Sequence, residues 1–221
     1  MPQLIPDDDT AGFDMKLTTS ASNKIETNVF LKNGPSAFAV PGYVVPHGYR
    51  LLIGAEKPAA EGMEQTICLV ADGQEPETVY KVKMLVRNAP NAYLASKNCT
   101  QLIVWRTFDP RHRAVVTGFP RTIFNHLLDS HDIMITDEQQ TSDGKRFWME
   151  RIADAISVPE QFVYYIDLDN LDDSLVPKIE SIDTYDEFVD SYVSVGWGND
   201  DNYRSRVFMI SKRDLSQLIK M

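Results

Sequence analysis

The residues best placed to do chemistry form a short polar loop at positions 139–144, with the sequence QQTSDG, directly before a predicted helix. Backbone N–H groups at a helix N-terminus lack partners within the helix and lie at the positive end of its dipole, so small residues there can wrap a pyrophosphate. The same residues also suit an ordinary helix start, with Ser142 or Asp143 as the N-cap and Gly144 as a permissive loop residue. An anion site and a plain helix cap therefore both remain open.

The elements predicted around this loop form a strand, helix and strand unit. Residues 132–136 (DIMIT) and 161–169 (QFVYYIDLD) read as strands, and residues 145–156 (KRFWMERIADAI) carry apolar side chains at helical spacing. Such a unit favours parallel pairing of its two strands through a right-handed crossover. The loop would then lie at the end of the first strand, where the helix begins.

Other segments complete the predicted domain. Further strands are expected at residues 66–73, 79–88, 100–109, 113–119 and 206–211, and further helices at 121–131 and 185–194. The first three of these strands follow one another with no helix between them, which favours antiparallel pairing. The sequence therefore predicts a mixed sheet.

This order of elements over residues 65–211 resembles the GNAT superfamily of N-acetyltransferases. The stretch Gln139-x-x-Ser142-x-Gly144 is similar to that family's Q/R-x-x-G-x-G/A loop, with Ser142 where the family has Gly, and the stretch from Tyr192 to Trp197 (YVSVGW) is similar to its F-Y-x-x-x-G-F. The resemblance implies an α/β (α+β) fold whose central sheet is mixed, mainly antiparallel, and flanked by helices.

The resemblance also implies a reaction, an acyl-CoA-dependent N-acyl transfer to an amine that the sequence does not identify. Acetyl-CoA would be the cofactor, and Tyr192 the general acid that protonates the leaving thiolate. Asp137 or Glu138, beside the strand that precedes the loop, would deprotonate the amine, for which a raised carboxylate pKa is needed. The residues expected to bind the cofactor are Gln139, Gln140, Thr141, Ser142, Asp143, Gly144 and Lys145.

Two other charged clusters have simpler interpretations. The acidic stretch 167–173 could hold a divalent cation, but a solvated acidic loop is the favoured reading, and no metal site is predicted. Arg106, Arg111 and Arg113, with His112, form a basic turn that could grip a phosphate. A turn whose charges pair with the surplus of carboxylates is the favoured reading there as well.

Composition limits the class of protein. The 221 residues include 22 Lys or Arg and 32 Asp or Glu, a net charge of −10, which argues against a dedicated nucleic-acid binder. A hydrophobic content of 43% can build a core, two cysteines cannot form a disulfide framework, and no apolar run is long enough to cross a bilayer. These features predict a cytoplasmic protein without a membrane partner.

The chain is expected to divide near residue 65. Residues 1–64 are broken by Ser, Thr, Asn, Pro and Gly and predict an irregular N-terminal arm with one or two short strands, whereas residues 65–221 form the predicted domain. The alternative to an enzyme is a non-catalytic protein-interaction module, of the kind that a phage or other mobile element encodes. Its protein partner would dock on the N-terminal arm or on the acidic surface.

Overall fold

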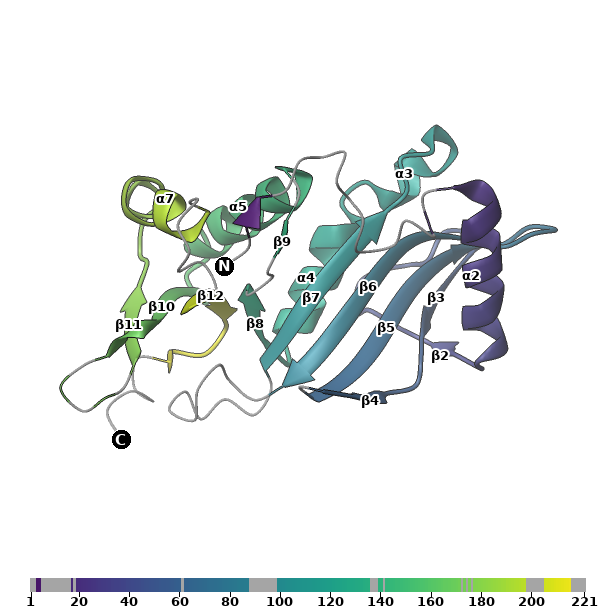
Figure 1. The fold of residues 1–221 in the computed structure, drawn as a ribbon. Coiled ribbons are helices and arrows are strands. Elements are labelled where there is room, and N and C mark those ends of the chain that lie inside the picture. The colour runs from purple at the N-terminus through teal and green to yellow at the C-terminus, as the bar shows by residue number, and fades with distance from the viewer. Residues whose placement is uncertain are drawn as a thin grey trace. The chain divides into compact units, whose positions relative to one another are not determined.

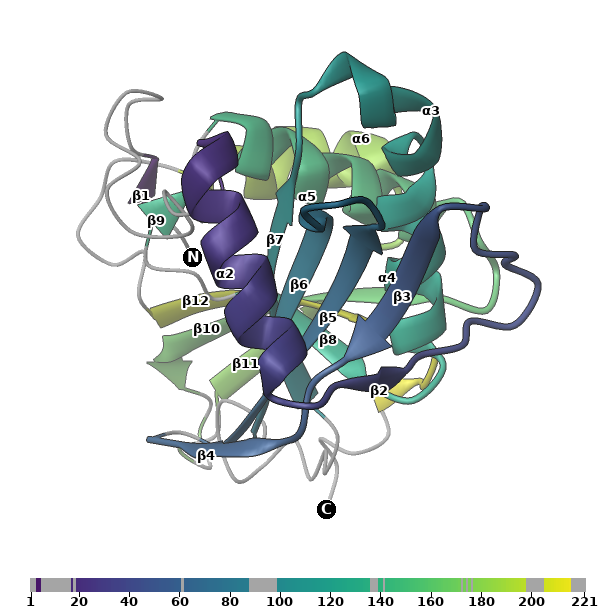
Figure 2. The same cartoon turned by 90° about the vertical axis from the view of Figure 1, so that its right-hand side faces the viewer.

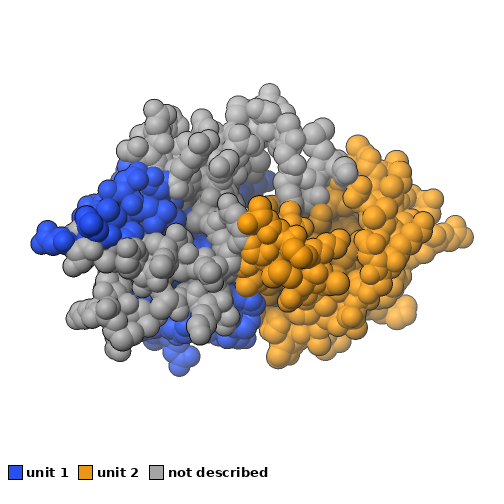
Figure 3. Space-filling model, turned by 60° about the horizontal axis from the view of Figure 1, so that its bottom comes forward, with its two compact units in different colours: residues 1–10, 87–101, 128–221 blue, residues 11–86, 102–127 orange. Residues whose placement is uncertain are grey.

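The protein has an α+β fold in which antiparallel sheets are covered by helices (Figure 1). The computed structural model describes residues 3–4, 17, 19–60, 62–87, 99–135, 139–140, 142–171, 173, 175, 177–197 and 205–215. The chain forms two compact units, which Figure 3 colours separately. Unit 1 comprises residues 1–10, 87–101 and 128–221, and unit 2 comprises residues 11–86 and 102–127.

Unit 2 is built on an antiparallel sheet. Its strands are β2 (Ser36–Ala37), β3 (Tyr49–Ile53), β4 (Lys57–Ala59), β5 (Gly62–Ala71), β6 (Glu77–Arg87) and β7 (Cys99–Arg106), the last of which begins with three residues that count with unit 1. They are ordered β7-β6-β5-β3-β2, with β4 also paired to β5. The long β5–β6 hairpin is the centre of this sheet, and the sequence prediction of antiparallel strands is confirmed here.

Helices cover both faces of this sheet. Helix α2 (Ser20–Lys32) places Phe30 and Leu31 against buried Cys68 and Val70, and it crosses in front of the strands in Figure 2. On the opposite face, the Phe119 ring of helix α4 (Phe119–Leu128) contacts the Tyr80 ring at a centroid distance of 4.9 Å. Side chains alternate across a strand, so Cys68 and Val70 face α2, whereas Tyr80, opposite Leu69, faces α4.

The first 64 residues contain more regular structure than the sequence predicts. Residues 20–32 form a helix and residues 36–59 contain three strands, so the expectation of an irregular arm is wrong for this part of the chain. The helix escapes pattern-based prediction because its buried positions are polar, Asn23 and Thr27, and its hydrophobic periodicity is therefore weak. Its N-cap is Thr19, whose hydroxyl accepts from the Ser22 N–H at 3.3 Å.

The strand predicted at residues 113–119 is also wrong, because a helical turn stands there. Pro110 opens the 3₁₀ turn η2 (Pro110–His112), capped by the Asp109 carboxylate, which accepts from the Arg111 N–H at 2.9 Å. The chain continues directly into α3 (Arg113–Val116). Val115 and Val116 are therefore helical although they are β-branched, because they continue the capped turn that precedes them. Gly118, at φ +75°, ends the segment.

Unit 1 has a four-stranded antiparallel sheet. Its strands are β8 (Asp132–Ile135), β10 (Phe162–Leu171), β11 (Pro177–Ser181) and β12 (Arg206–Ser211), in the order β11-β10-β12-β8. The predicted direct parallel pairing of β8 with β10 is wrong, because β12 lies between them and is antiparallel to both. The parallel neighbour of β8 is instead the stretch 99–101 within the same unit.

The two faces of this sheet have separate cores. Val207 and Met209 of β12 pack with Met134, Tyr164 and Leu215 on one face. On the other, Phe208 meets a helical segment made of α6 (Tyr185–Glu187), η3 (Phe188–Tyr192), which is a π-helical turn, and α7 (Val193–Gly196). Helix α5 (Ser142–Ile156) buries Trp148, Ile152 and Ala155. The helices predicted over 121–131, 145–156 and 185–194 are confirmed.

Among the described residues, no helix has the length and hydropathy that crossing a lipid bilayer requires.

Candidate functional site

The loop predicted to bind a cofactor begins as a strand and ends as a helix. Gln139 and Gln140 form the short strand β9, which pairs in parallel with β1 (Gln3–Leu4). The four residues from Ser142 to Lys145 make the first turn of α5. The predicted Asp137, Glu138 and Thr141 lie outside the described residues. A helix does follow β9, but it begins three residues earlier than the predicted Lys145, so Ser142, Asp143 and Gly144, expected in the loop or at the N-cap, lie in its first turn.

An open hollow of about 310 Å³ lies beside this turn. Its lining combines two cationic side chains, one carboxylate, and polar and apolar side chains: Ser142, Lys145, Arg146, Met149, Glu150, Ala153 and Tyr185. Arg146 is paired with Asp143 at 2.6 Å, and the Lys145 ammonium stands 5.9 Å from the centre of the Trp197 ring. The hollow thus offers two cations beside a half-exposed aromatic ring, Tyr185.

Tyr192, the predicted general acid, lies in a different setting. Its side chain is buried, its ring packs on Tyr165 and Phe208, and its hydroxyl donates to Glu180 Oε2 at 2.9 Å. Burial, followed by the bond to Glu180, raises the Tyr192 pKa well above its ordinary value. The structure does not bring Tyr192 to the lining of the hollow, and its hydroxyl proton is engaged by the partly exposed Glu180 carboxylate.

No cluster of three or more His, Cys, Asp or Glu side chains suited to a metal ion occurs in the part of the chain that the structure describes. Asp167, in the acidic stretch considered for a cation, instead accepts from the Asp169 N–H at 3.1 Å. That bond lies within β10, at the point where its pairing with β11 shifts register between Asp167 and Leu171.

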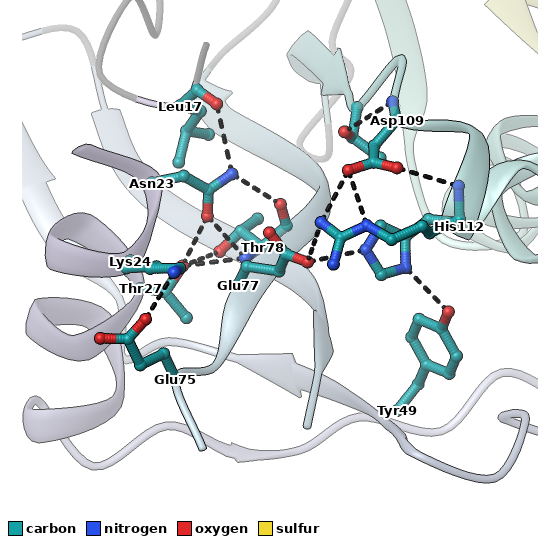
Figure 4. Close-up of polar contacts among 12 residues, drawn as sticks. Leu17, Asn23, Lys24, Thr27, Tyr49, Glu75, Glu77, Thr78, Asp109 and His112 are labelled. Atoms are coloured by element: carbon teal, nitrogen blue, oxygen red, sulfur yellow. Dashed lines mark hydrogen bonds and ion pairs between the residues drawn. The ribbon is translucent and has the colours of Figure 1, made fainter. Parts of the chain in front are cut away.

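A polar network in unit 2 was not predicted as a unit, and Figure 4 shows its side chains converging from β3, β6 and η2. The Tyr49 hydroxyl lies 2.8 Å from His112 Nδ1, and His112 Nε2 lies 2.8 Å from Glu77 Oε1. His112 is buried, whereas Tyr49 and Glu77 are partly exposed. Both nitrogens of one imidazole are therefore engaged by side chains distant in the sequence.

Arg111 extends this network towards solvent. Its Nη2 donates to Glu77 Oε1 at 3.0 Å and to Asp109 Oδ2 at 2.7 Å. The hydrogen bonds from the Arg111 side chain and backbone lower the pKa of Asp109 to about 2. Two members of the predicted basic turn, Arg111 and His112, are thus paired with carboxylates, as the simpler interpretation predicted, whereas Arg106 lies over the Phe108 ring.

The same strand start anchors helix α2. Asn23 Oδ1 accepts from the Thr78 N–H at 2.8 Å, Asn23 Nδ2 donates to the Thr78 carbonyl at 2.9 Å, and Thr27 lies 2.8 Å from the Thr78 hydroxyl. All three side chains are buried (Figure 4). Glu77 and Thr78 are consecutive, so the helix anchor and the imidazole network share one strand end.

Sequence reasoning could not assemble these residues, because 63 positions separate Tyr49 from His112 and 35 separate His112 from Glu77. Tyr49 lies in the segment for which the sequence predicts an irregular arm, and for His112 the sequence indicates only a place in a basic turn. The one usable signal was a His beside an Asp-Pro turn, since such a turn fixes the direction of the side chains that follow it.

Comparison with known proteins supplies no template for either site. No family model, no curated protein and no solved structure matches this chain at a significant level.

Proposed function

We propose that unit 1 binds the nucleotide end of an acyl-CoA at the start of α5, as an N-acyltransferase-like protein. The observation that carries this proposal is the hollow beside the predicted loop, lined by Lys145, Arg146 and Tyr185. In a chain of net charge −10, two adjacent cations beside an aromatic ring suit phosphates and a base, since cations bind phosphate oxygens and bases stack on rings.

Other features bear on the reaction. Because β12 lies between β8 and β10, these two strands are not neighbours, and the proposal places no part of the acyl-CoA between them. We assign no proton transfer to Tyr192, whose hydroxyl is held by Glu180. Asp137 or Glu138 stays the proposed base for deprotonating the amine that receives the acyl group.

Titration of the full-length protein with acetyl-CoA in a calorimeter tests this proposal. We expect saturable binding that weakens by more than about 100-fold in the double variant Lys145→Glu/Arg146→Glu, because each charge-assisted bond to a phosphate contributes about 1.5–3 kcal/mol and the variant removes two cations. Gly144→Glu, which adds a carboxylate to the first turn, should weaken binding as well. Lys57→Glu in unit 2 is the matched control. Absence of binding by the wild type at millimolar acetyl-CoA would overturn the proposal.

A second candidate, protein binding, is favoured by apolar side chains on the outer face of α2. Two of its large aliphatic side chains face outward, Ile25 being 64% and Val29 50% exposed, whereas Leu31 packs inward and the buried positions include the polar Asn23 and Thr27. A helix that faced only water would carry the opposite pattern. We propose that an amphipathic helix of a partner protein packs along this outer face, which Figure 2 shows turned towards the viewer.

The outer face also has a defined length and charge. Ala21, Ile25, Val29 and Lys32 follow one another at three- and four-residue spacing, and all four are exposed. Lys32 is the charged residue in this row, so a carboxylate of the partner would fit at its end.

Lys32 also provides the test. Amine-reactive cross-linking in the native host should join Lys32 to a partner in the wild type, and Ile25→Asp/Val29→Asp should abolish that cross-link, because buried carboxylates oppose apolar packing. Asn28→Asp, which adds a charge to the same helix, is the control and should retain the cross-link. A cross-link that survives the double substitution would contradict this interface.

A further inference from the structure

The Tyr49, His112 and Glu77 side chains form a continuous hydroxyl, imidazole and carboxylate chain in unit 2. Glu77 Oε1 can only accept, so the His112 Nε2 to which it is bonded carries the proton. In the neutral imidazole the other nitrogen, Nδ1, is then an acceptor for the Tyr49 hydroxyl at 2.8 Å. A hydroxyl bonded to a base, which is oriented by a third group, is the arrangement that activates a nucleophile.

Three separate elements fix this geometry. Tyr49 begins β3, Glu77 begins β6, and His112 ends the 3₁₀ turn that Asp109 caps. The Tyr49 and His112 rings meet edge to face, with centroids 5.8 Å apart and an interplanar angle of 88°. The carboxylate that orients His112 is itself held, because Arg111 donates to the same oxygen. The Tyr49, His112 and Glu77 side chains are therefore held in this arrangement before any ligand binds.

We propose that Tyr49 is a nucleophile that accepts an acyl group from an uncharged carboxylic ester. The Tyr49 oxygen would bond to the ester carbonyl carbon while its proton passes to His112 Nδ1. Collapse of the tetrahedral intermediate would break the bond to the leaving oxygen, which takes that proton from His112 and departs as an alcohol. Water, activated by the same imidazole, would then hydrolyse the acyl-tyrosine and restore both groups.

The charges around Tyr49 favour an uncharged donor over a phosphoryl donor. Glu77 and Asp109 carry two negative charges, and Arg111, which bridges them, carries one positive charge. Among these three groups the carboxylates outnumber the guanidinium, and like charges repel, so a phosphate would be disfavoured directly beside Glu77 and Asp109. An uncharged ester meets no such penalty. This inference concerns unit 2 and does not depend on acyl-CoA binding in unit 1.

The full-length protein treated with p-nitrophenyl acetate provides the test. Peptide mapping by mass spectrometry should find an acetyl group on Tyr49, formed about 100-fold faster than on the other tyrosines, since a positioned general base contributes on that order. Tyr43 is the internal reference, because its hydroxyl is buried and has no hydrogen-bond partner among the described residues. Acetylation of Tyr49 no faster than that of exposed tyrosines would overturn the proposal without any variant.

Variants then separate chemistry from structure. Tyr49→Phe should remove the early release of p-nitrophenolate, His112→Gln should lower the Tyr49 acetylation rate to that of an unassisted tyrosine, and Tyr43→Phe should change neither. An unchanged Tyr49 acetylation rate in a folded His112→Gln protein would contradict the role of the imidazole.

Discussion

Replacing Phe208 with alanine is expected to lower the free energy of unfolding of unit 1 by about 3–5 kcal/mol, the range for removing a large aromatic side chain from a core. Phe208 is fully buried in the central strand β12. Its ring contacts four other rings, those of Tyr165, Phe188, Tyr192 and Trp197. A truncation there leaves a cavity that none of these side chains can fill from its present position.

Chemical denaturation followed by tryptophan fluorescence measures this loss, because Trp197 stacks on Phe208 at a centroid distance of 5.3 Å. Phe108→Ala is the matched control: Phe108 is 76% exposed, so its removal should change stability by less than about 0.5 kcal/mol. Equal effects of the two substitutions would contradict the packing described for β12.

The second large effect is expected at Asn23, whose replacement with alanine should destabilise unit 2 by about 3 kcal/mol. The substitution leaves the buried Thr78 carbonyl without its bond from Asn23 Nδ2 and removes an acceptor from the Thr78 N–H. Unsatisfied buried polar groups cost about 1–3 kcal/mol each. Helix α2 would also lose its bond to the Leu17 carbonyl.

Thermal unfolding of the purified protein would detect this change as a lowered Tm. Asn28→Ala lies on the exposed face of the same helix and should be neutral or slightly stabilising, because alanine is the better helix former. A Tm for Asn23→Ala as high as that of Asn28→Ala would show that the network anchoring α2 is not formed.

The strands that the sequence predicts correctly are those in which the buried side chains are also the hydrophobic ones. In β5, Ile67, Cys68, Leu69 and Val70 are consecutive and all buried, as expected for a strand covered on both faces. Helix α5 can be predicted for the same reason, since its buried residues Trp148, Ile152 and Ala155 recur at helical spacing. Local pattern suffices where burial and hydrophobicity agree.

The features that the sequence did not reveal depend on distant partners. Asn23 and Thr27 look like surface residues until Thr78, some 50 positions away, supplies their bonds. The position of β12 between β8 and β10 also depends on distant residues, because the hydrophobic pattern of a strand does not show which strands become its neighbours. For the same reason the start of α5 was predictable as a helix terminus, whereas the Tyr49–His112–Glu77 chain was not.

The place of β12 sets the order in which unit 1 can form during synthesis. Strands β8 and β10 leave the ribosome first, and each lacks one of its neighbours until residues 206–211 follow. Until then each presents an edge of unpaired N–H and C=O groups, which is a template for pairing with another chain. Completion of this sheet therefore waits until residues 206–211 have been synthesised, and a nascent chain interrupted before Arg206 carries two aggregation-prone edges.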